Sequence, residues 1–307
     1  MRESPKAPRD VNPRELPLDE LIERAGVIIE ALPYISAFRG AVIVVKYGGS
    51  AMLEPELKHT VIQDVALMEL AGMRLVIVHG GGPAIDAHLD RLGIEPQFVD
   101  GLRVTTAETL EVVGMVLSAL NREIVSALNR AGTLAVGLTG KDARLVEARK
   151  HSPPAPNGGK GQDIGFVGEV VRINPQIIKL LHENNIIPVI MPLGMDAQGQ
   201  AYNINADTVA SAVAAEMKAD KLVLLTEARG ILRDRRDSNS VIPQIARAEV
   251  EALIESGVVD GGMIPKVRAC LNALEQGVGK THILDGRLPH SLLLEILTDK
   301  GIGTLIY

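Results

Sequence analysis

The feature that most constrains the fold is a stretch in which an apolar strand delivers a lysine to two glycines. Residues 42–50 read VIVVKYGGS. The run 42–45 is β-branched and continuous rather than alternating, which is typical of a strand covered on both faces of a parallel sheet. Lys46 falls at the carboxyl end of this strand, where open α/β sheets bind their ligands. The stretch therefore predicts an α/β fold with a functional site at that edge of the sheet.

Gly48 and Gly49 suit an anion site, because residues without a Cβ let backbone N–H groups approach a ligand closely. A simpler alternative is a lysine that extends into solvent beside an ordinary glycine turn. Taken alone, this stretch leaves both interpretations open. The other motifs of the chain have to separate them.

Composition excludes several classes of protein. The chain has 307 residues, 46% of them hydrophobic, which is enough for one large α/β unit or two lobes. A net charge of −6 and only 2% aromatic residues disfavour nucleic acid as a partner. The single cysteine, Cys270, excludes an internal disulfide framework and suits a reducing compartment. No apolar stretch has the length of a membrane helix or of a signal peptide core, so we expect a cytoplasmic protein that does not bind membranes.

Alternating strand and helix patterns predict a mainly parallel sheet with helices on both faces. A polar, glycine-rich segment at 151–162 is expected at the tip of a hairpin that returns through 164–171, residues 194–200 are expected to form a turn, and a lobe boundary is expected between 195 and 208. The expected strands cover 42–47, 74–79, 134–138, 143–149, 186–191, 221–225, 281–285 and 303–306. The expected helices cover 56–71, 83–92, 107–129, 175–185, 205–218, 247–256, 264–276 and 288–298.

The N-terminal segment lies outside this alternation. Residues 1–17 are polar, contain four prolines and are expected to form a mobile tail. Apolar residues then recur at helical spacing from Leu18 to Leu32, with charged residues on the other face. Such a helix either packs on its own domain or exchanges with another subunit. The pattern cannot separate the two, and taken alone it favours packing on its own domain.

A second glycine cluster, HGGG at 79–82, closes one strand and opens a helix at Pro83. Its glycines leave backbone donors and a positive helix end facing any bound anion. The same letters occur in esterase oxyanion holes, but the chain has no G-x-S-x-G nucleophile elbow. His79 is interpreted as a packing or hydrogen-bonding residue rather than an acid or base.

Three familiar nucleotide and metal motifs fail. GVGKT at 277–281 lacks the leading glycine of a P-loop, because position 274 is Leu274. No G-x-G-x-x-G follows a strand, which removes the main support for a dinucleotide-dependent dehydrogenase. His182 and Glu183 do not form H-E-x-x-H, because position 186 is Ile186.

Three further clusters place polar groups near expected helix starts. Arg103, in GLRVT, has the fork geometry that suits a carboxylate, although a surface arginine is the simpler interpretation. Asn203, Asn205 and Asp207 alternate into a helix start, and capping explains only one of them. Lys266 would bring a second cation to a glycine-rich helix start, although alone it is a solvated lysine.

In combination, these clusters resemble the amino acid kinase family, and within it the arginine-inhibited branch that acts on N-acetyl-L-glutamate. The resemblance implies an open αβα sandwich with a mainly parallel central sheet, an N-terminal oligomerisation helix within 1–37, an amino-acid-substrate lobe at 38–205 and a nucleotide-binding lobe at 206–307. The matching stretches, in family order, are VVKYGGSAM at 44–52, VHGGGPAID at 78–86, GLRVT at 101–105, NINAD at 203–207, ADKLVLLTEARGIL at 219–232 and GGMIPK at 261–266.

The resemblance implies phosphoryl transfer from ATP, with Mg²⁺ held mainly by the nucleotide phosphates, to the side-chain carboxylate of N-acetyl-L-glutamate. Such an acceptor is already ionised at neutral pH, so the reaction needs no general base. Catalytic roles are implied for Lys46, Lys266 and Asp207. Substrate contacts are implied for Gly81, Gly82, Arg103 and Asn203, and nucleotide contacts for Gly49, Thr226, Gly230, Ile231, Val258 and Asp260.

The resemblance also implies feedback regulation. Tyr34, Lys221, His282, Glu295 and Gly301 would contact inhibitory L-arginine, although Glu295 without the resemblance is simply an exposed helix residue. The N-terminal helix would interlace dimers into a homohexamer, a trimer of dimers. Two alternatives stay open: a family member with another acceptor, and a catalytically silent arginine-binding regulator. Whether a PII-type signalling protein binds the hexamer is also left open by the sequence.

Overall fold

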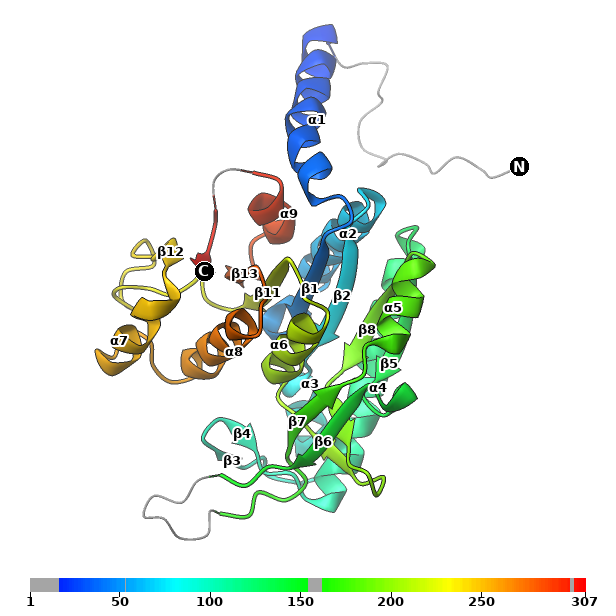
Figure 1. Ribbon diagram of the computed structural model, residues 1–307, viewed down its shortest axis with the longest axis vertical. Helices are drawn as coiled ribbons and strands as arrows, with labels where there is room; N and C mark the ends of the chain where they lie inside the picture. The colour runs from blue at the N-terminus through cyan, green and yellow to red at the C-terminus, as the bar shows by residue number, and fades with distance from the viewer. Residues whose placement is uncertain (1–16, 53, 154–161, 299–300) are drawn as a thin grey trace.

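The computed structural model describes residues 17–52, 54–153, 162–298 and 301–307. Helices cover both faces of a central sheet (Figure 1), which confirms the expected three-layer α/β architecture. Most of the expected tail and the tip of the expected hairpin, residues 1–16 and 154–161, lie outside the described residues. No helix among those described is long and apolar enough to cross a membrane.

The central sheet has eight strands in the order β12-β14-β13-β11-β1-β2-β8-β5. Six of them run parallel to one another. At the edge, β14 runs antiparallel to β13, and β12 pairs in parallel with β14. Because β1 pairs with both β2 and β11, the two halves of the chain share one continuous sheet. The strands are β1 (Val42–Tyr47), β2 (Arg74–His79), β5 (Leu134–Thr139), β8 (Ile186–Met191), β11 (Lys221–Thr226), β12 (Gln244–Ile245), β13 (Lys280–Asp285) and β14 (Thr304–Ile306).

Side-chain alternation along β1 divides the core into two parts. Ile43 and Val45 pack with α2, α4 and α9 on one face, whereas Val44 packs with α5, α6 and α8 on the other. The same alternation sends Lys46 and Tyr47 to opposite faces at the end of the strand. The helices are α1 (Leu18–Phe38), α2 (Pro55–Leu70), α3 (Gly82–Arg91), α4 (Ala107–Arg130), α5 (Gln176–Glu183), α6 (Ala206–Glu216), α7 (Val250–Glu255), α8 (Met263–Glu275) and α9 (Ser291–Ile296).

The smaller sheets differ from the expected pattern. The turn expected at 194–200 is present at 196–200, but residues 194 and 195 belong to β9, which pairs with β10 across the turn. The strand expected at 143–149 begins only at Val146, because Ala143 and Arg144 adopt positive φ of 50° and 52° in a short turn. A four-stranded sheet has the order β10-β9-β6-β7, and β3 pairs with β4. These strands are β3 (Phe98–Val99), β4 (Leu102–Arg103), β6 (Val146–Lys150), β7 (Gly168–Ile173), β9 (Leu193–Met195) and β10 (Ala201–Asn203).

Helix α1 projects away from the rest of the chain (Figure 1). None of its 21 residues, all of which the structure describes, is buried, and Leu18, Ile28 and Ile29 are 71%, 70% and 66% exposed. Only Phe38, at its C-terminal end, packs against the core. The expectation from periodicity alone, that this helix packs on its own domain, is therefore wrong.

Candidate active site

Three charged side chains meet at the carboxyl end of β1. Lys46 extends from this strand, Asp207 from the first turn of α6 and Lys266 from the first turn of α8. The Nζ atom of Lys46 lies 3.1 Å from Oδ1 of Asp207, and Nζ of Lys266 lies 2.8 Å from Oδ2. Lys46 and Asp207 are buried, whereas the side chain of Lys266 is 24% exposed. The structure thus brings together the three residues for which catalytic roles are expected.

The charges in this triad affect the two buried groups, Asp207 and Lys46, differently. Burial by itself raises the pKa of Asp207, but attraction by Lys46 and Lys266 outweighs it and holds the pKa of this carboxyl below its usual range. Burial lowers the pKa of Lys46, with a further contribution from Lys266, while Asp207 opposes the shift. Two lysines on one carboxylate give the three side chains a net positive charge in a largely desolvated position, which favours an anion.

Asn205 determines where Asp207 lies. The side-chain oxygen of Asn205 accepts hydrogen bonds from the backbone N–H groups of Asp207, at 2.8 Å, and Thr208, at 3.2 Å. Asn205 is therefore the N-cap of α6, as its residue type predicts. The cap fixes the first helical turn, and with it the direction in which the carboxylate points.

Residues 48–52, which we call the glycine loop, follow β1 and continue into a short 3₁₀ turn. A Cβ at Gly48 would lie 2.8 Å from Nζ of Lys46, so the lysine rests against this residue. Gly49 has a φ of +71°, which favours glycine, and a Cβ there would lie 3.0 Å from a carboxylate oxygen of Glu227. The N–H of Gly80 donates to the Tyr47 carbonyl at 2.7 Å, which ties the HGGG segment to this loop.

The four residues expected to contact an amino-acid substrate line one cavity of about 160 Å³. Gly81 and Gly82 contribute the start of α3, Arg103 the hairpin β3–β4, and Asn203 the end of β10. A Cβ at Gly81 would lie 2.7 Å from a methyl group of Leu117, so this position is closely packed. The cavity is also lined by residues 205 and 206, directly before Asp207, and therefore adjoins the charged triad.

Arg103 is held in this cavity from two sides. Its Nη1 donates to Oδ1 of Asp86 at 2.6 Å, and its guanidinium lies 4.7 Å from the centre of the Phe98 ring. Asn203 is held as well, because its amide donates to the Thr105 hydroxyl at 3.2 Å. Both polar side chains are thus oriented before any ligand arrives. Sequence reasoning missed Asp86 and Phe98 as partners, because no local spacing links them to Arg103.

The residues expected to contact a nucleotide lie beyond the end of β11. Thr226 ends this strand. Its hydroxyl donates to the carbonyl of Ala228 and accepts from the N–H of the same residue, in the turn that follows. Gly230 has a φ of +140°, and a Cβ at this position would lie 2.6 Å from the Thr304 hydroxyl. The same hydroxyl accepts a hydrogen bond from the Ile231 N–H at 2.8 Å. The path of this loop therefore depends on a glycine and on one buried threonine of β14.

Val258 and Asp260 lie in the loop between α7 and α8. The carbonyl of Asp260 accepts a hydrogen bond from the Met263 N–H at 3.1 Å, at the start of the helix that carries Lys266. Its carboxylate forms an ion pair with Arg235, from the segment that continues the β11 exit loop. The structure thus joins the two chain segments expected to bind a nucleotide.

A second charged cluster lies near the amino ends of β11 and β13. Nδ1 of His282 lies 2.7 Å from Oε1 of Glu295, and Nε2 lies 3.5 Å from Nζ of Lys221. Burial lowers the pKa of His282 and favours the neutral imidazole, which donates to Glu295 and accepts from Lys221. Burial raises the pKa of Glu295, but the bond from His282 and a backbone N–H outweigh it, so this pKa lies below its usual range.

The remaining residues expected at an arginine site surround this cluster. A Cβ at Gly301 would lie 3.6 Å from the carboxylate oxygens of Glu295. Nζ of Lys221 lies 4.8 Å from the centre of the Phe38 ring, so the end of α1 covers this lysine. Tyr34 is half-buried one turn earlier on the same helix. The structure therefore brings the end of α1 to the Lys221, His282 and Glu295 cluster.

Comparison with known proteins identifies the family. Residues 41–285 match the model of the amino acid kinase family. The chain belongs to the amino acid kinase family. The acetylglutamate kinase of Heliobacterium modesticaldum is 54% identical over 289 residues, which cover 93% of this chain and 98% of that protein. The acetylglutamate kinase of a Nostoc species is 55% identical over 284 residues, with 92% and 93% covered.

Solved structures also resemble this chain over most of its length. N-acetylglutamate synthase from Neisseria gonorrhoeae, complexed with coenzyme A and N-acetyl-glutamate, superposes with a TM-score of 0.79 and 26% identity over 92% of this chain and 63% of that one. The same synthase complexed with coenzyme A and L-arginine has a TM-score of 0.77 and 25% identity over 92% and 65% of the two chains. These likenesses extend over most of the chain, whereas the family model ends at residue 285, before Glu295 of the second cluster.

Proposed function

We propose that the protein transfers the γ-phosphoryl group of ATP to the side-chain carboxylate of N-acetyl-L-glutamate, giving N-acetyl-L-glutamyl 5-phosphate for arginine biosynthesis. The observation that carries this proposal is the Lys46–Asp207–Lys266 triad beside a cavity lined by Arg103 and Asn203. Family membership supports it, as do relatives named acetylglutamate kinase that match at about 54% identity over nearly their whole length.

The triad suits phosphoryl transfer, which needs positioning and compensation of charge on the phosphoryl oxygens rather than covalent chemistry. Lys46 and Lys266 stabilise the transferring group from two sides, and Asp207 orients both lysines through its two oxygens. Gly49, with the HGGG glycines, supplies backbone N–H donors. The acceptor carboxylate is ionised at neutral pH, so no residue has to remove a proton.

The cavity suits an N-acylated dicarboxylate. Arg103 binds the α-carboxylate, and Asp86 keeps its guanidinium in place through the 2.6 Å bond. Asn203, held by Thr105, can exchange hydrogen bonds with the acetamido group. Gly81 and Gly82 bring backbone N–H groups close to the carboxylate that accepts the phosphoryl group.

We assign the nucleotide to the 206–307 lobe and the amino acid to the 38–205 lobe. Thr226, Gly230 and Ile231, together with Val258 and Asp260, line the nucleotide site. Magnesium, when bound with ATP, neutralises phosphate charge and is held mainly by phosphate oxygens. Asp207 fits this assignment, because its two oxygens face Lys46 and Lys266 at 3.1 and 2.8 Å.

L-Arginine, the feedback inhibitor in this proposal, is assigned to the cluster of Lys221, His282 and Glu295. Glu295 can pair with the guanidinium and Lys221 with the carboxylate of the ligand. Gly301 and Tyr34 complete the site from two sides. The synthase structure complexed with L-arginine supports an arginine site within this fold.

Helix α1 is assigned to subunit exchange in a homohexamer, because its large apolar side chains from Leu18 to Leu32 are exposed in the described part of the chain. A variant lacking residues 1–34 is expected to sediment as a dimer and to be inhibited poorly by arginine. Analytical ultracentrifugation and inhibition curves check this expectation. An arginine-sensitive hexamer in the truncated variant would contradict it.

The central test is a hydroxamate assay with ATP, magnesium and N-acetyl-L-glutamate, with and without arginine. Acyl-phosphate is expected to form with this acceptor and to decrease when arginine is added. Glutamate, aspartate, carbamate and uridylate serve as competing acceptors. Preference for one of them would indicate another member of the family, and arginine binding without any ATP turnover would indicate a silent regulator.

We place the reaction in the cytoplasm, where ATP is available and the buried thiol of Cys270 stays reduced.

A further inference from the structure

We infer that Tyr47 is a positioning residue for phosphoryl transfer, because its hydroxyl holds the glycine loop in the shape that receives the phosphates. The inference rests on the proposed function and adds a residue to it. Tyr47 faces away from the charged triad and does not touch the reacting groups. It acts through the backbone of residues 48–52.

The glycine loop is held from both faces of the sheet. Lys46 lies on the α6 and α8 side, with its Nζ against Gly48, whereas Tyr47 lies on the α2 and α4 side. The Tyr47 hydroxyl donates to the carbonyl of Ala51 at 2.7 Å, in the 3₁₀ turn that closes the loop. Two consecutive residues of β1 thus fix the beginning and the end of a five-residue loop that must present N–H groups to an anion.

The Tyr47 bond is buried and well protected from water. Tyr47 is 2% exposed and Ala51 1% exposed, so the bond is made away from bulk solvent. Burial raises the pKa of the Tyr47 hydroxyl, with a contribution from Glu123, so the group remains a protonated donor at any physiological pH. A buried carbonyl that loses its donor is costly, and the 3₁₀ turn would shift to find another partner.

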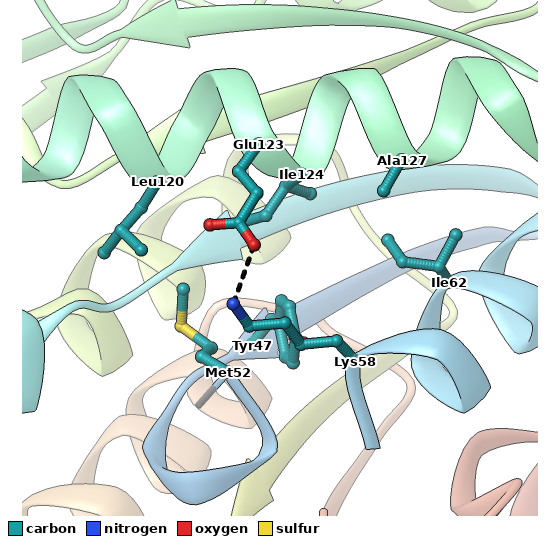
Figure 2. Close-up of a pocket in the computed structure, with 8 residues that line it drawn as sticks. All are labelled: Tyr47, Met52, Lys58, Ile62, Leu120, Glu123, Ile124 and Ala127. Atoms are coloured by element: carbon teal, nitrogen blue, oxygen red, sulfur yellow. Dashed lines mark hydrogen bonds and ion pairs between the residues drawn. The ribbon is translucent and has the colours of Figure 1, made fainter. Parts of the chain in front are cut away.

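The loop has room to shift. A small cavity of about 30 Å³ lies between the 3₁₀ turn, α2 and α4, and its wall includes Tyr47, Met52 and Ile62. Figure 2 shows Lys58 of α2 and Glu123 of α4 across this cavity, joined by an ion pair of 2.7 Å. A cavity of this size accepts roughly one or two water molecules. Without the hydroxyl, Ala51 and Met52 can therefore move toward the cavity, and the glycine loop would shift away from its position beside Lys46.

The test compares Tyr47→Phe with Tyr202→Phe, a matched control that loses a partly buried hydroxyl bond of 2.9 Å to Asp196, in a surface turn. Calorimetric titration with a non-hydrolysable ATP analogue measures nucleotide binding directly. For Tyr47→Phe we expect the Kd of the analogue and the KM for ATP to rise about 5- to 10-fold, the effect of one lost buried hydrogen bond. We expect kcat to fall, and the KM for N-acetyl-L-glutamate to stay within about twofold of the wild-type value.

Tyr202→Phe is expected to leave the nucleotide Kd within about twofold of the wild-type value, even where its thermal stability decreases equally. Replacement of Tyr47 by p-aminophenylalanine, which keeps a donor at the same place, is expected to restore nucleotide binding. Equal Kd values for wild type and Tyr47→Phe, or equal losses in both phenylalanine variants, would overturn the inference. If the wild type binds the analogue but does not phosphorylate N-acetyl-L-glutamate, the acceptor proposal fails while the titration still decides the role of Tyr47.

Discussion

The two charged clusters of this protein are built from similar parts but differ in charge balance. At the carboxyl end of β1, two lysines share the single carboxylate of Asp207. Near the amino end of β11, Lys221 and Glu295 flank His282, whose pKa is lowered by burial. The first cluster therefore carries a net positive charge, whereas the second is close to neutral.

This difference indicates what each cluster can bind. A buried cluster with an excess of positive charge is stabilised by an anion, and a transferring phosphoryl group supplies one. A neutral cluster that holds separated positive and negative ends suits a ligand that carries both charges. Arginine is such a ligand, with a guanidinium at one end and a carboxylate at the other. Charge balance thus separates the proposed transfer site from the proposed regulatory site more clearly than residue types do.

The largest effect is expected from removing one charge of the triad. Lys46→Ala should lower kcat by about 10²- to 10³-fold or more, because a preorganised donor to the phosphoryl oxygens is lost. The fold should persist, since Lys266 still pairs with Asp207. The hydroxamate assay measures turnover and circular dichroism measures folding. Lys179→Ala, which removes an exposed lysine of α5, is the control. Near-normal turnover of Lys46→Ala would contradict the assignment of the first cluster to phosphoryl transfer.

A buried histidine, His79, ends the strand beside β1 near the first cluster. His79 contacts the Gly80 carbonyl and the Asn121 amide, and burial lowers its pKa from the ordinary 6.5 to about 4. Between these values the unfolded chain takes up a proton that the folded protein does not, so stability decreases as pH falls through this window. Two to three pH units correspond to about 3 kcal/mol.

The wild type should accordingly lose about 2–3 kcal/mol more of its unfolding free energy between pH 8 and pH 4.5 than His79→Asn does. Asparagine keeps a donor for the Gly80 carbonyl but has no titrating group. Denaturant unfolding at both pH values measures the difference. Parallel losses in the two proteins would show that His79 does not contribute to the pH dependence.

A smaller effect is expected from a change at Glu295, in the second cluster. Glu295→Gln removes the negative end of the second cluster but keeps an oxygen for the Ile302 N–H, which now donates at 2.9 Å. We expect at least an approximately tenfold increase in the arginine concentration for half-inhibition, the usual scale of one lost charged pair, with turnover unchanged within about twofold. Glu251→Gln, at an exposed ion pair with Arg268, is the control. Unchanged inhibition in Glu295→Gln would remove this carboxylate from the arginine site.

The sequence predicts best what depends on local order. The continuous apolar run placed Lys46 at a strand end, and the residue type of Asn205 predicted the cap that orients Asp207. Regular alternation was enough to predict the three-layer fold. The strands β3, β4 and β12 have only two residues each, too few for any periodicity.

Long-range partners could not be predicted in this way. Arg103 pairs with Asp86 across 17 positions, and His290 with the buried Asp64 across 226. Nothing in the sequence near either residue indicates these contacts, because they arise only when separate parts of the chain pack together. The exposure of α1 was equally hidden, since an amphipathic pattern shows that an apolar face needs cover but not which chain provides it.

The pairing of β1 with β11 has a consequence for how the two clusters can influence each other. In this register Lys221 lies opposite Ile43, and Lys46 lies opposite Leu224. The two lysines are therefore separated by three residues, about 10 Å along the strand direction, on neighbouring strands of one sheet. Inhibition would not require a relay through distant elements. In the proposed regulation, these two neighbouring strands are the shortest path between the arginine site and the triad.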